Sequence, residues 1–381
     1  MRLVLPLLLL AAVVAGILPT DLSVVEELGK LKGKQMAAMR RRLNDIRKHV
    51  RDELKKMPKI SGAEQALVDD VIKKAKGRSR DKIREGGDRV SDVNEKLKVA
   101  GNFFQGDVVL EEEQIDNLFP DLVGAVSSAT SGLIGALGLT KRKRQAYRDS
   151  NYPATTWGST FYYYFDVSVA GTHTETVARL AMQLWQNNTC INFVESRTAA
   201  HRVRYFSGGG CYSNVGMTRL AEQDISLGQY CDSVGTAAHE IGHALGFFHE
   251  QSRFDRDNSI IVQTQNTEPD WVDQFAKQTS ATNYNYGMAY DYGSIMHYGG
   301  TSASSNGEET MVARKWNYQD TMGSDMVSFR DISAMNEHYN CKSRCSSSSL
   351  TVCSNGGFPH PRDCSRCLCP SGFAGPYCTQ R

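Results

Sequence analysis

The stretch HEIGHALGFFHE at residues 239–250 decides the fold of this chain. On a helix, His239 and His243 lie four residues apart, so both imidazoles project from the same face. This spacing lets two neutral ring nitrogens reach one Zn²⁺ at about 2.0–2.1 Å. Gly246 can adopt a positive φ and end the helix abruptly, which lets the chain turn back and bring His249 to the same ion.

The ligand count indicates what kind of metal site this is. Glu240 follows the first histidine and is placed to contact a water on the metal instead of the metal itself. Three protein ligands leave one position open, whereas structural zinc is usually closed by four ligands. The alternative is a purely structural role, but three His on one strongly patterned turn rarely pack a core. The pattern therefore predicts a catalytic zinc centre.

A second motif, YDYGSIMHY at residues 290–298, follows further along the chain. Taken alone, this stretch is typical of an aromatic-rich turn without chemistry of its own. Beside the elongated zinc motif it matches the helix, loop and methionine turn of the metzincin arrangement.

The two motifs together carry a family resemblance. HEIGHALGFFHEQSRFDRD at 239–257 and SIMHY at 294–298 resemble the astacin family of zinc endopeptidases, over roughly residues 145–341. The resemblance implies an α+β fold, a two-subdomain metzincin domain with the cleft between its halves. It also implies that His239, His243 and His249 bind one zinc ion and that Glu240 is the general base.

Three further roles are implied by the same resemblance. Tyr298 is expected to be a fifth, switchable zinc ligand that swings off the metal to stabilise the tetrahedral intermediate. Met296 is expected to form an apolar floor under the zinc, and Glu250 to pair with the new N-terminus after processing. In the first third of the chain, FQGD at 104–107 matches the segment with which the family keeps its precursor latent. Asp107 is therefore expected on the zinc in place of the catalytic water, although the bare motif also fits an ordinary Gly-Asp turn.

Composition divides the chain into two unlike parts. Its 381 residues carry a net charge of +2, which argues against a nucleic-acid binder. Residues 17–144 carry a net charge of +6 and no cysteine, whereas residues 145–381 carry −5 and all ten cysteines. Residues 1–15 have the pattern of a secretory signal peptide, and no later stretch is apolar enough to span a membrane. The sequence thus predicts a secreted, extracellular protein with disulfides.

The boundary between the two parts contains four consecutive basic residues, 141–144. In an exported chain they predict cleavage between Arg144 and Gln145 by a basic-specific protease, with Gln145 or Ala146 as the mature N-terminus. We therefore expect a helical prosegment at 16–144, with a linker at 123–140, and a protease domain at 145–341. Asn187 begins a glycosylation sequon.

Residues 342–381 hold six cysteines and end in CLCPSGFAGPYC, which looks like an EGF-like module. Six cysteines permit 15 pairings, and a metal site is the rival interpretation of them. The family resemblance implies the following five bridges: Cys190–Cys341, Cys211–Cys231, Cys345–Cys364, Cys353–Cys367 and Cys369–Cys378.

Periodicity gives a coarse set of elements. Strands are expected at 160–169, 191–194 and 201–206, and helices at 36–57, 176–185, 234–248 and 329–339. We interpret the chain as a secreted zinc endopeptidase that cleaves extracellular proteins and is made as a latent precursor. Two alternatives stay open: an inactive protease-like protein that binds partners through its EGF-like module, and a zinc hydrolase of another substrate class.

Overall fold

A computed structural model describes residues 41–56, 60–76, 89–119, 144–148, 151–345 and 351–381. The predicted signal peptide at 1–15, the linker at 123–140 and basic residues 141–143 lie outside the described residues. Within the described part, no helix combines the length and the apolar character needed to cross a bilayer.

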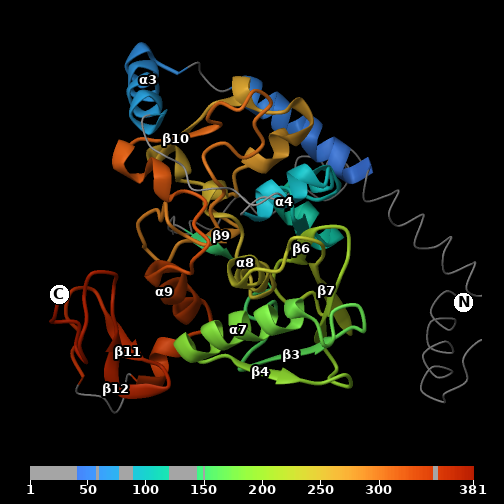
Figure 1. The fold of residues 1–381 in the computed structure, drawn as a ribbon, viewed down its shortest axis with the longest axis vertical. Coiled ribbons are helices and arrows are strands. Elements are labelled where there is room, and N and C mark those ends of the chain that lie inside the picture. Colours follow the sequence, from blue (N-terminus) through green and yellow to red (C-terminus); the bar gives the residue numbers. More distant parts are fainter. Residues whose placement is uncertain (1–40, 57–59, 77–88, 120–143, 149–150, 346–350) are drawn as a thin grey trace, which may run out of the picture.

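The fold is α+β, as the sequence predicts, with helices and strands mixed along the chain (Figure 1). Besides the helix over 41–56, the helices are α3 Gly62–Lys76, α4 Val90–Lys96, α5 Glu112–Leu118, α7 His173–Asn188, α8 Val234–Ala244 and α9 Phe329–His338. The strands are β1 Val108–Val109, β2 Arg144–Tyr147, β3 Thr160–Phe165, β4 Asn192–Glu195, β5 Arg202–Phe206, β6 Cys211–Asn214, β7 Glu222–Leu227, β8 Ile260–Val262, β9 Asn283–Tyr284, β10 Met311–Ala313, β11 Phe358–His360 and β12 Asp363–Leu368.

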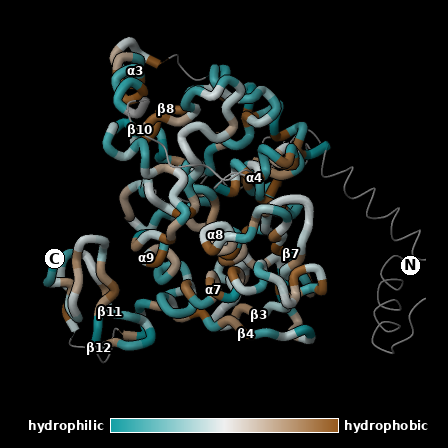
Figure 2. The backbone as a smooth tube through the Cα atoms, viewed as in Figure 1, coloured by the Kyte–Doolittle hydropathy of each residue, from teal (hydrophilic) through white to brown (hydrophobic). Residues whose placement is uncertain are grey.

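The central sheet has the strand order β1-β6-β7-β5-β3-β4. Its pairs are parallel except for β6 with β7. Alternate residues of β3 are buried, namely Phe161, Tyr163 and Phe165, and they share one core cluster with buried hydrophobic residues of α7 and α8. Helix α7 lies across β3 and β4, and α8 packs against α7 (Figure 1). Figure 2 shows the hydrophobic residues gathered on α8 and on β3 and β4 beside α7.

Three predicted elements have bounds that differ by three residues or more from the structure, and the first, the helix expected at 176–185, spans His173–Asn188. The strand expected at 160–169 ends at Phe165, because the backbone turns there and Ala170 N donates to Asp166 O at 2.9 Å. The helix expected at 234–248 ends at Ala244, for the reason given below for Gly246. Strands β6 and β7 have no counterpart among the predicted elements.

The segment upstream of residue 144 lies against the rest of the chain. Leu43, Ile46 and Val50 of the helix over 41–56 are buried in one cluster with Phe104 and Ile115. Strand β1 pairs in parallel with β6, so this upstream segment supplies one edge of the central sheet. The described part of the predicted prosegment is therefore a packed part of the fold.

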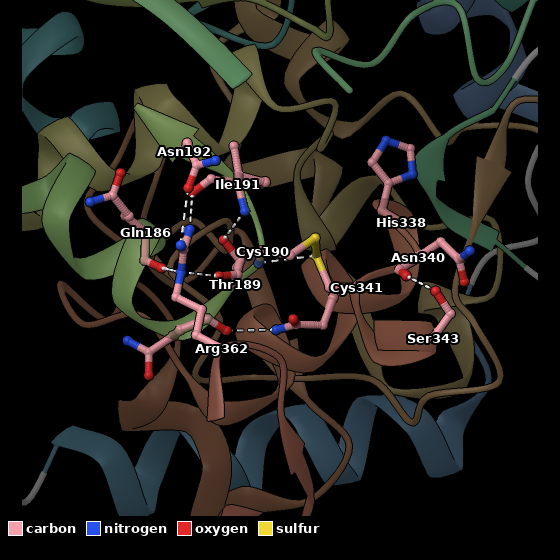
Figure 3. Close-up of a disulfide and its surroundings, with 12 residues drawn as sticks. Gln186, Thr189, Cys190, Ile191, Asn192, His338, Asn340, Cys341, Ser343 and Arg362 are labelled. Atoms are coloured by element: carbon pink, nitrogen blue, oxygen red, sulfur yellow. Dashed lines mark hydrogen bonds between the residues drawn. A yellow bond between two sulfur atoms is a disulfide. The ribbon is translucent and has the colours of Figure 1, made fainter. Parts of the chain in front are cut away.

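The C-terminal residues form a small two-stranded unit, β11 and β12, beside α9 (Figure 1). Five disulfides join the same pairs that the family resemblance implies. Figure 3 shows Cys190–Cys341 and, beside it, Arg362 reaching the end of α7. The Arg362 guanidinium donates to the carbonyls of Gln186, Thr189 and Ile191 at 2.6–2.8 Å. These contacts hold the C-terminal unit against the sheet domain.

Candidate metal centre

Helix α8 begins and ends through local hydrogen bonds. Ser233 Oγ accepts from Thr236 N at 3.0 Å and so caps the first turn. At the other end, Gly246 has φ +109°, Gly246 N donates to His243 O and Phe247 N donates to Gly242 O. This pair of bonds is a Schellman motif, which needs a residue with positive φ after the last helical turn. The chain turns back at Gly246, which places His249 beside the helix.

The turn brings four ligand groups together. His239, His243, His249 and Asp107 are all buried, and each offers one ligand atom within 4.8 Å of the others. Asp107 Oδ2 lies 3.2 Å from both His239 Nε2 and His249 Nε2, and those two nitrogens are 3.3 Å apart. Four atoms placed about 2.0–2.1 Å from one centre in a tetrahedron lie about 3.3 Å from each other. The spacing of these three groups thus fits a zinc ion, and His243 Nε2 lies 3.6 Å from the other Asp107 oxygen, Oδ1.

The hydrogen bonds of the three imidazoles also fit a metal. The Nδ1 atoms of His239 and His243 face backbone carbonyls, Ile295 O at 2.7 Å and Phe247 O at 2.6 Å. His249 Nδ1 faces Gln105 Oε1 at 3.1 Å. All three acceptors are oxygens, so a proton on Nδ1 of each ring makes these bonds and leaves the Nε2 lone pair for a metal. His243 Nε2 has no hydrogen-bond partner although it is buried. A cation is the group that satisfies these lone pairs.

Glu240 lies next to this cluster on α8. Its carboxylate is fully buried and neither oxygen has a hydrogen-bond partner. Burial raises the pKa of Glu240 well above its usual range, and the charge of Asp107 raises it further. An unpartnered buried carboxyl beside a metal site is a candidate for proton transfer.

Two residues of the methionine turn border the site. Tyr298 Oη lies 2.7 Å from Asp107 Oδ2 and 2.7 Å from Gln105 O, so its single proton is donated to one of them at a time. Burial, with the charge of Asp107, raises the pKa of Tyr298 well above its usual range, and the phenol stays protonated. Met296 Sδ lies 2.7 Å from the position of a Cβ at Gly242, so the methionine packs directly on α8.

The other predicted site residues lie away from the metal cluster. Glu250 Oε1 accepts from Arg253 Nη1 and from Asp291 N, while Glu250 Oε2 is buried without a partner. Arg144 and Gln145 belong to β2, which pairs with β9. Asn187 is exposed at the end of α7.

Sequence reasoning missed two residues that complete the site. Gln105 fixes the tautomer of His249, and its Nε2 donates to Ala276 O at 3.0 Å, which orients the amide. Asn94 Nδ2 donates to Gly106 O and Cys211 O, and Asn94 Oδ1 accepts from Cys211 N. Gln105 lies within the 104–107 motif, so the local sequence does point to it. Asn94 has no local signal, because its partners are distant in sequence.

The sequence profile described as Astacin (Peptidase family M12A) matches residues 149–340, which is half of the chain. The chain belongs to the astacin family. Zinc metalloproteinase nas-31 of Caenorhabditis elegans is 47% identical over 91% of this chain and 56% of its own length. Zinc metalloproteinase nas-34 of the same organism is 39% identical over 72% of this chain and 45% of its own length.

The astacin profile stops before the C-terminal unit, and this chain spans about half the length of these two curated relatives. Among solved structures, high choriolytic enzyme 1, a hatching enzyme zinc-protease from medaka, is 29% identical. The match covers 51% of this chain and 94% of the medaka chain, with a TM-score of 0.45.

Proposed function

We propose that this astacin-family chain is a zinc-dependent endopeptidase made as a latent precursor. The observation that supports this best is the set of three buried imidazoles that converge on Asp107 beside the unpartnered carboxyl of Glu240. The relatives named above are zinc metalloproteinases, which agrees with this function. An inactive binding protein has no need for a buried carboxyl kept without partners, since burial of such a group is unfavourable.

His239, His243 and His249 would hold the zinc ion in the active form. Bound there, zinc supplies Lewis acidity that polarises a peptide carbonyl and acidifies water. Glu240 then accepts a proton from the attacking water and delivers it to the leaving amine. Departure of Asp107 removes a negative charge from beside Glu240, which lowers the pKa of Glu240 toward the range of a useful base.

Tyr298 is the second group that acts on the substrate. With Asp107 gone, its phenol loses the acceptor 2.7 Å away and is free to donate to the oxyanion that develops on the substrate carbonyl. We assign it as an oxyanion donor, and as the switchable fifth ligand implied by the family resemblance. Met296 provides the apolar packing under the ligand helix.

Latency is assigned to Asp107. Its carboxylate occupies the position among the histidines that an open catalytic site leaves to water. Strand β1, which follows Asp107 directly, occupies the free edge of β6. The upstream segment therefore blocks both the position of the catalytic water and a sheet edge along which an extended peptide would bind.

Secretion and processing of the chain are also part of this proposal. We propose a signal peptide at 1–15, a prosegment at 16–144, cleavage between Arg144 and Gln145, a protease domain at 145–341 and an EGF-like module at 342–381. Glu250 Oε2, buried without a partner, is suited to receive the new N-terminal amine. Extracellular proteins are the proposed substrates, and Asn187 the glycosylation site.

The Glu240→Gln variant tests the catalytic assignment. The full chain is loaded with zinc and processed with trypsin, and trypsin is then blocked. We expect kcat on a fluorogenic peptide to fall by about 10²–10⁴-fold or more while zinc content stays at one per chain. Unchanged hydrolysis by the Glu240→Gln variant would overturn the assignment. Parent chain that holds zinc but cleaves no peptide would favour the inactive binding protein instead.

The Asp107→Ala variant tests latency separately. We expect the unprocessed variant to hydrolyse a short peptide that the unprocessed parent leaves intact. Glu112→Ala, at an exposed carboxylate of the same segment, is the control and should stay latent. An equally silent Asp107→Ala precursor would count against the switch.

A further inference from the structure

A pocket lies directly beside the metal cluster. It is bordered by His239, by Tyr298 and by the loop Gly323, Ser324 and Asp325. Because His239 is a ligand of the metal site, a substrate residue next to the bond being cleaved can place its side chain there. This pocket therefore bears on which peptides the enzyme selects.

The upstream segment borders this pocket with Val90 and with the charged side chain of Arg89. Its Nε donates to Gly323 O at 2.8 Å. The space left beside it is about 20 Å³, which is room for about one water molecule. Arg89 immediately precedes α4, whose Val90 and Val93 are buried in the main core. The guanidinium is thus held in the pocket by the same element that packs against the sheet domain.

Two glycines lie against the Arg89 side chain, Gly323 of the pocket loop and Gly299 beside it. A Cβ at Gly299 would lie 2.7 Å from Arg89 Nη1, and the three nearest atoms to that Cβ all belong to Arg89. A Cβ at Gly323 would collide with Arg89 Nε. The absence of both side chains creates a slot that accepts a flat guanidinium, and any side chain at either position would narrow it.

The polar groups of the pocket suit a cation. Gly323 O is an acceptor that already binds a guanidinium nitrogen. Asp325 is exposed at the pocket rim and is the one Asp or Glu among the described residues that border it. Apart from Arg89 itself, no Lys or Arg of the described residues borders the pocket. Once Arg89 leaves, the pocket presents acceptors and a negative charge to the substrate.

We propose that, after the upstream segment is removed, this pocket binds an arginine or lysine side chain of the substrate, next to the bond that is cleaved. The inference rests on the proposed peptidase function and adds a substrate class to it. In the precursor, Arg89 lies where the substrate side chain would bind after processing.

Matched peptides test the selectivity. The full chain is zinc-loaded and processed with trypsin, trypsin is blocked, and peptides that differ at one residue beside the cut carry Arg, citrulline, Leu or Asp. Citrulline keeps the shape of arginine without its charge. We expect kcat/KM to be about tenfold or more higher for Arg than for the other three, because the charged donor makes the stronger hydrogen bond. Equal rates, or a preference for Leu or Asp, would overturn the proposal.

The Gly299→Ala variant ties this preference to the pocket. Its methyl group projects into the slot, so kcat/KM for the Arg peptide should fall about tenfold more than for a matched Ala peptide. Gly209→Ala is the control, since a Cβ there meets nothing within 4 Å, and it should leave the preference unchanged. An Arg preference that survives Gly299→Ala would place the selectivity elsewhere.

A binding measurement separates this proposal from the peptidase function. In the unprocessed Arg89→Ala chain the pocket is vacated, so N-acetyl-argininamide should raise Tm in that variant and not in the parent, and the norleucine analogue should do so in neither. If no peptide is cleaved but this shift occurs, the peptidase function fails and the pocket stands. If peptides are cleaved but there is neither a Tm increase nor an Arg preference, the pocket proposal is wrong and the peptidase function stands.

Discussion

Glu95 makes the docking of the upstream segment sensitive to pH. Its Oε1 accepts from Ala303 N at 2.6 Å, so α4 is anchored at this point to the chain that follows the methionine turn. Burial raises the pKa of Glu95 to about 8, and the charges of Asp92 and Glu268 act in the same direction. The carboxyl is therefore protonated in the docked state at pH values where it is ionised in a free chain.

The sign of the effect follows from proton linkage. Below about pH 4.5 both states hold the proton, and the docked state keeps its full stability. As pH rises from 4.5 to 8, docking weakens, with an upper limit of about 5 kcal/mol set by the distance between the two pKa values. Glu95 is only partly buried, so we expect about 2 kcal/mol, or about 30-fold in the opening equilibrium. Glu95→Gln keeps the acceptor oxygen but has no proton to lose.

Hydrogen exchange of the full chain measures this directly. We expect the opening free energy of peptides from α4 to fall by about 2 kcal/mol between pH 4.5 and 8, after correction for intrinsic exchange, and to stay level in Glu95→Gln. Glu112→Gln, at an exposed carboxylate, should follow the parent. The reasoning is refuted if the opening free energy of α4 in the parent does not change with pH. It is also refuted if that free energy falls as steeply in Glu95→Gln as in the parent.

Two further substitutions test the packing of the site and of the C-terminal unit. Gly242→Ala should lower the free energy of unfolding by about 1–3 kcal/mol in urea, because the new methyl lies 2.7 Å from Met296 Sδ; an unchanged midpoint would contradict that packing. Arg362→Ala should cost about 1–3 kcal/mol by the same measurement, since three carbonyls at the end of α7 lose a charged donor. Arg366→Ala removes an exposed ion pair with Asp363 and should change the free energy of unfolding by about 0.5 kcal/mol or less. Equal effects of the two substitutions would show that Arg362 does not anchor the C-terminal unit.

The sequence predicted best what is fixed over a few residues. The spacing of His239 and His243, the helix stop at Gly246 and the return of His249 are all consequences of local backbone geometry, and the structure has all three. The end of the helix was placed four residues too late, because apolar residues Phe247 and Phe248 continue the hydrophobic pattern. They are buried after the turn, not on the helix, and periodicity alone does not distinguish these cases.

Contacts between segments that are distant in the chain could not be predicted from the sequence. Strands β6 and β7 contain buried polar residues such as Gln223 and Ser226, whose hydrogen bonds go to the carbonyls of Gly216 and Gly210 in the loops around these strands. No alternation of polar and apolar residues marks such strands. Arg89 likewise reads as one more charge in a charge-rich segment, and its place in a pocket follows only from tertiary packing. Asp107 was found through family resemblance, not from its local pattern.

The block on the metal site depends on more than the carboxylate of Asp107. Its backbone carbonyl accepts from Ser213 N at 3.0 Å, so strand pairing positions the residue independently of its side chain. Asn94 joins Gly106 to Cys211, and Arg89 fills the neighbouring pocket. Loss of the carboxylate would uncover the histidines but leave these contacts in place. Since the chemical block and the steric block use different residues, we expect full activity only after the upstream segment is cleaved away.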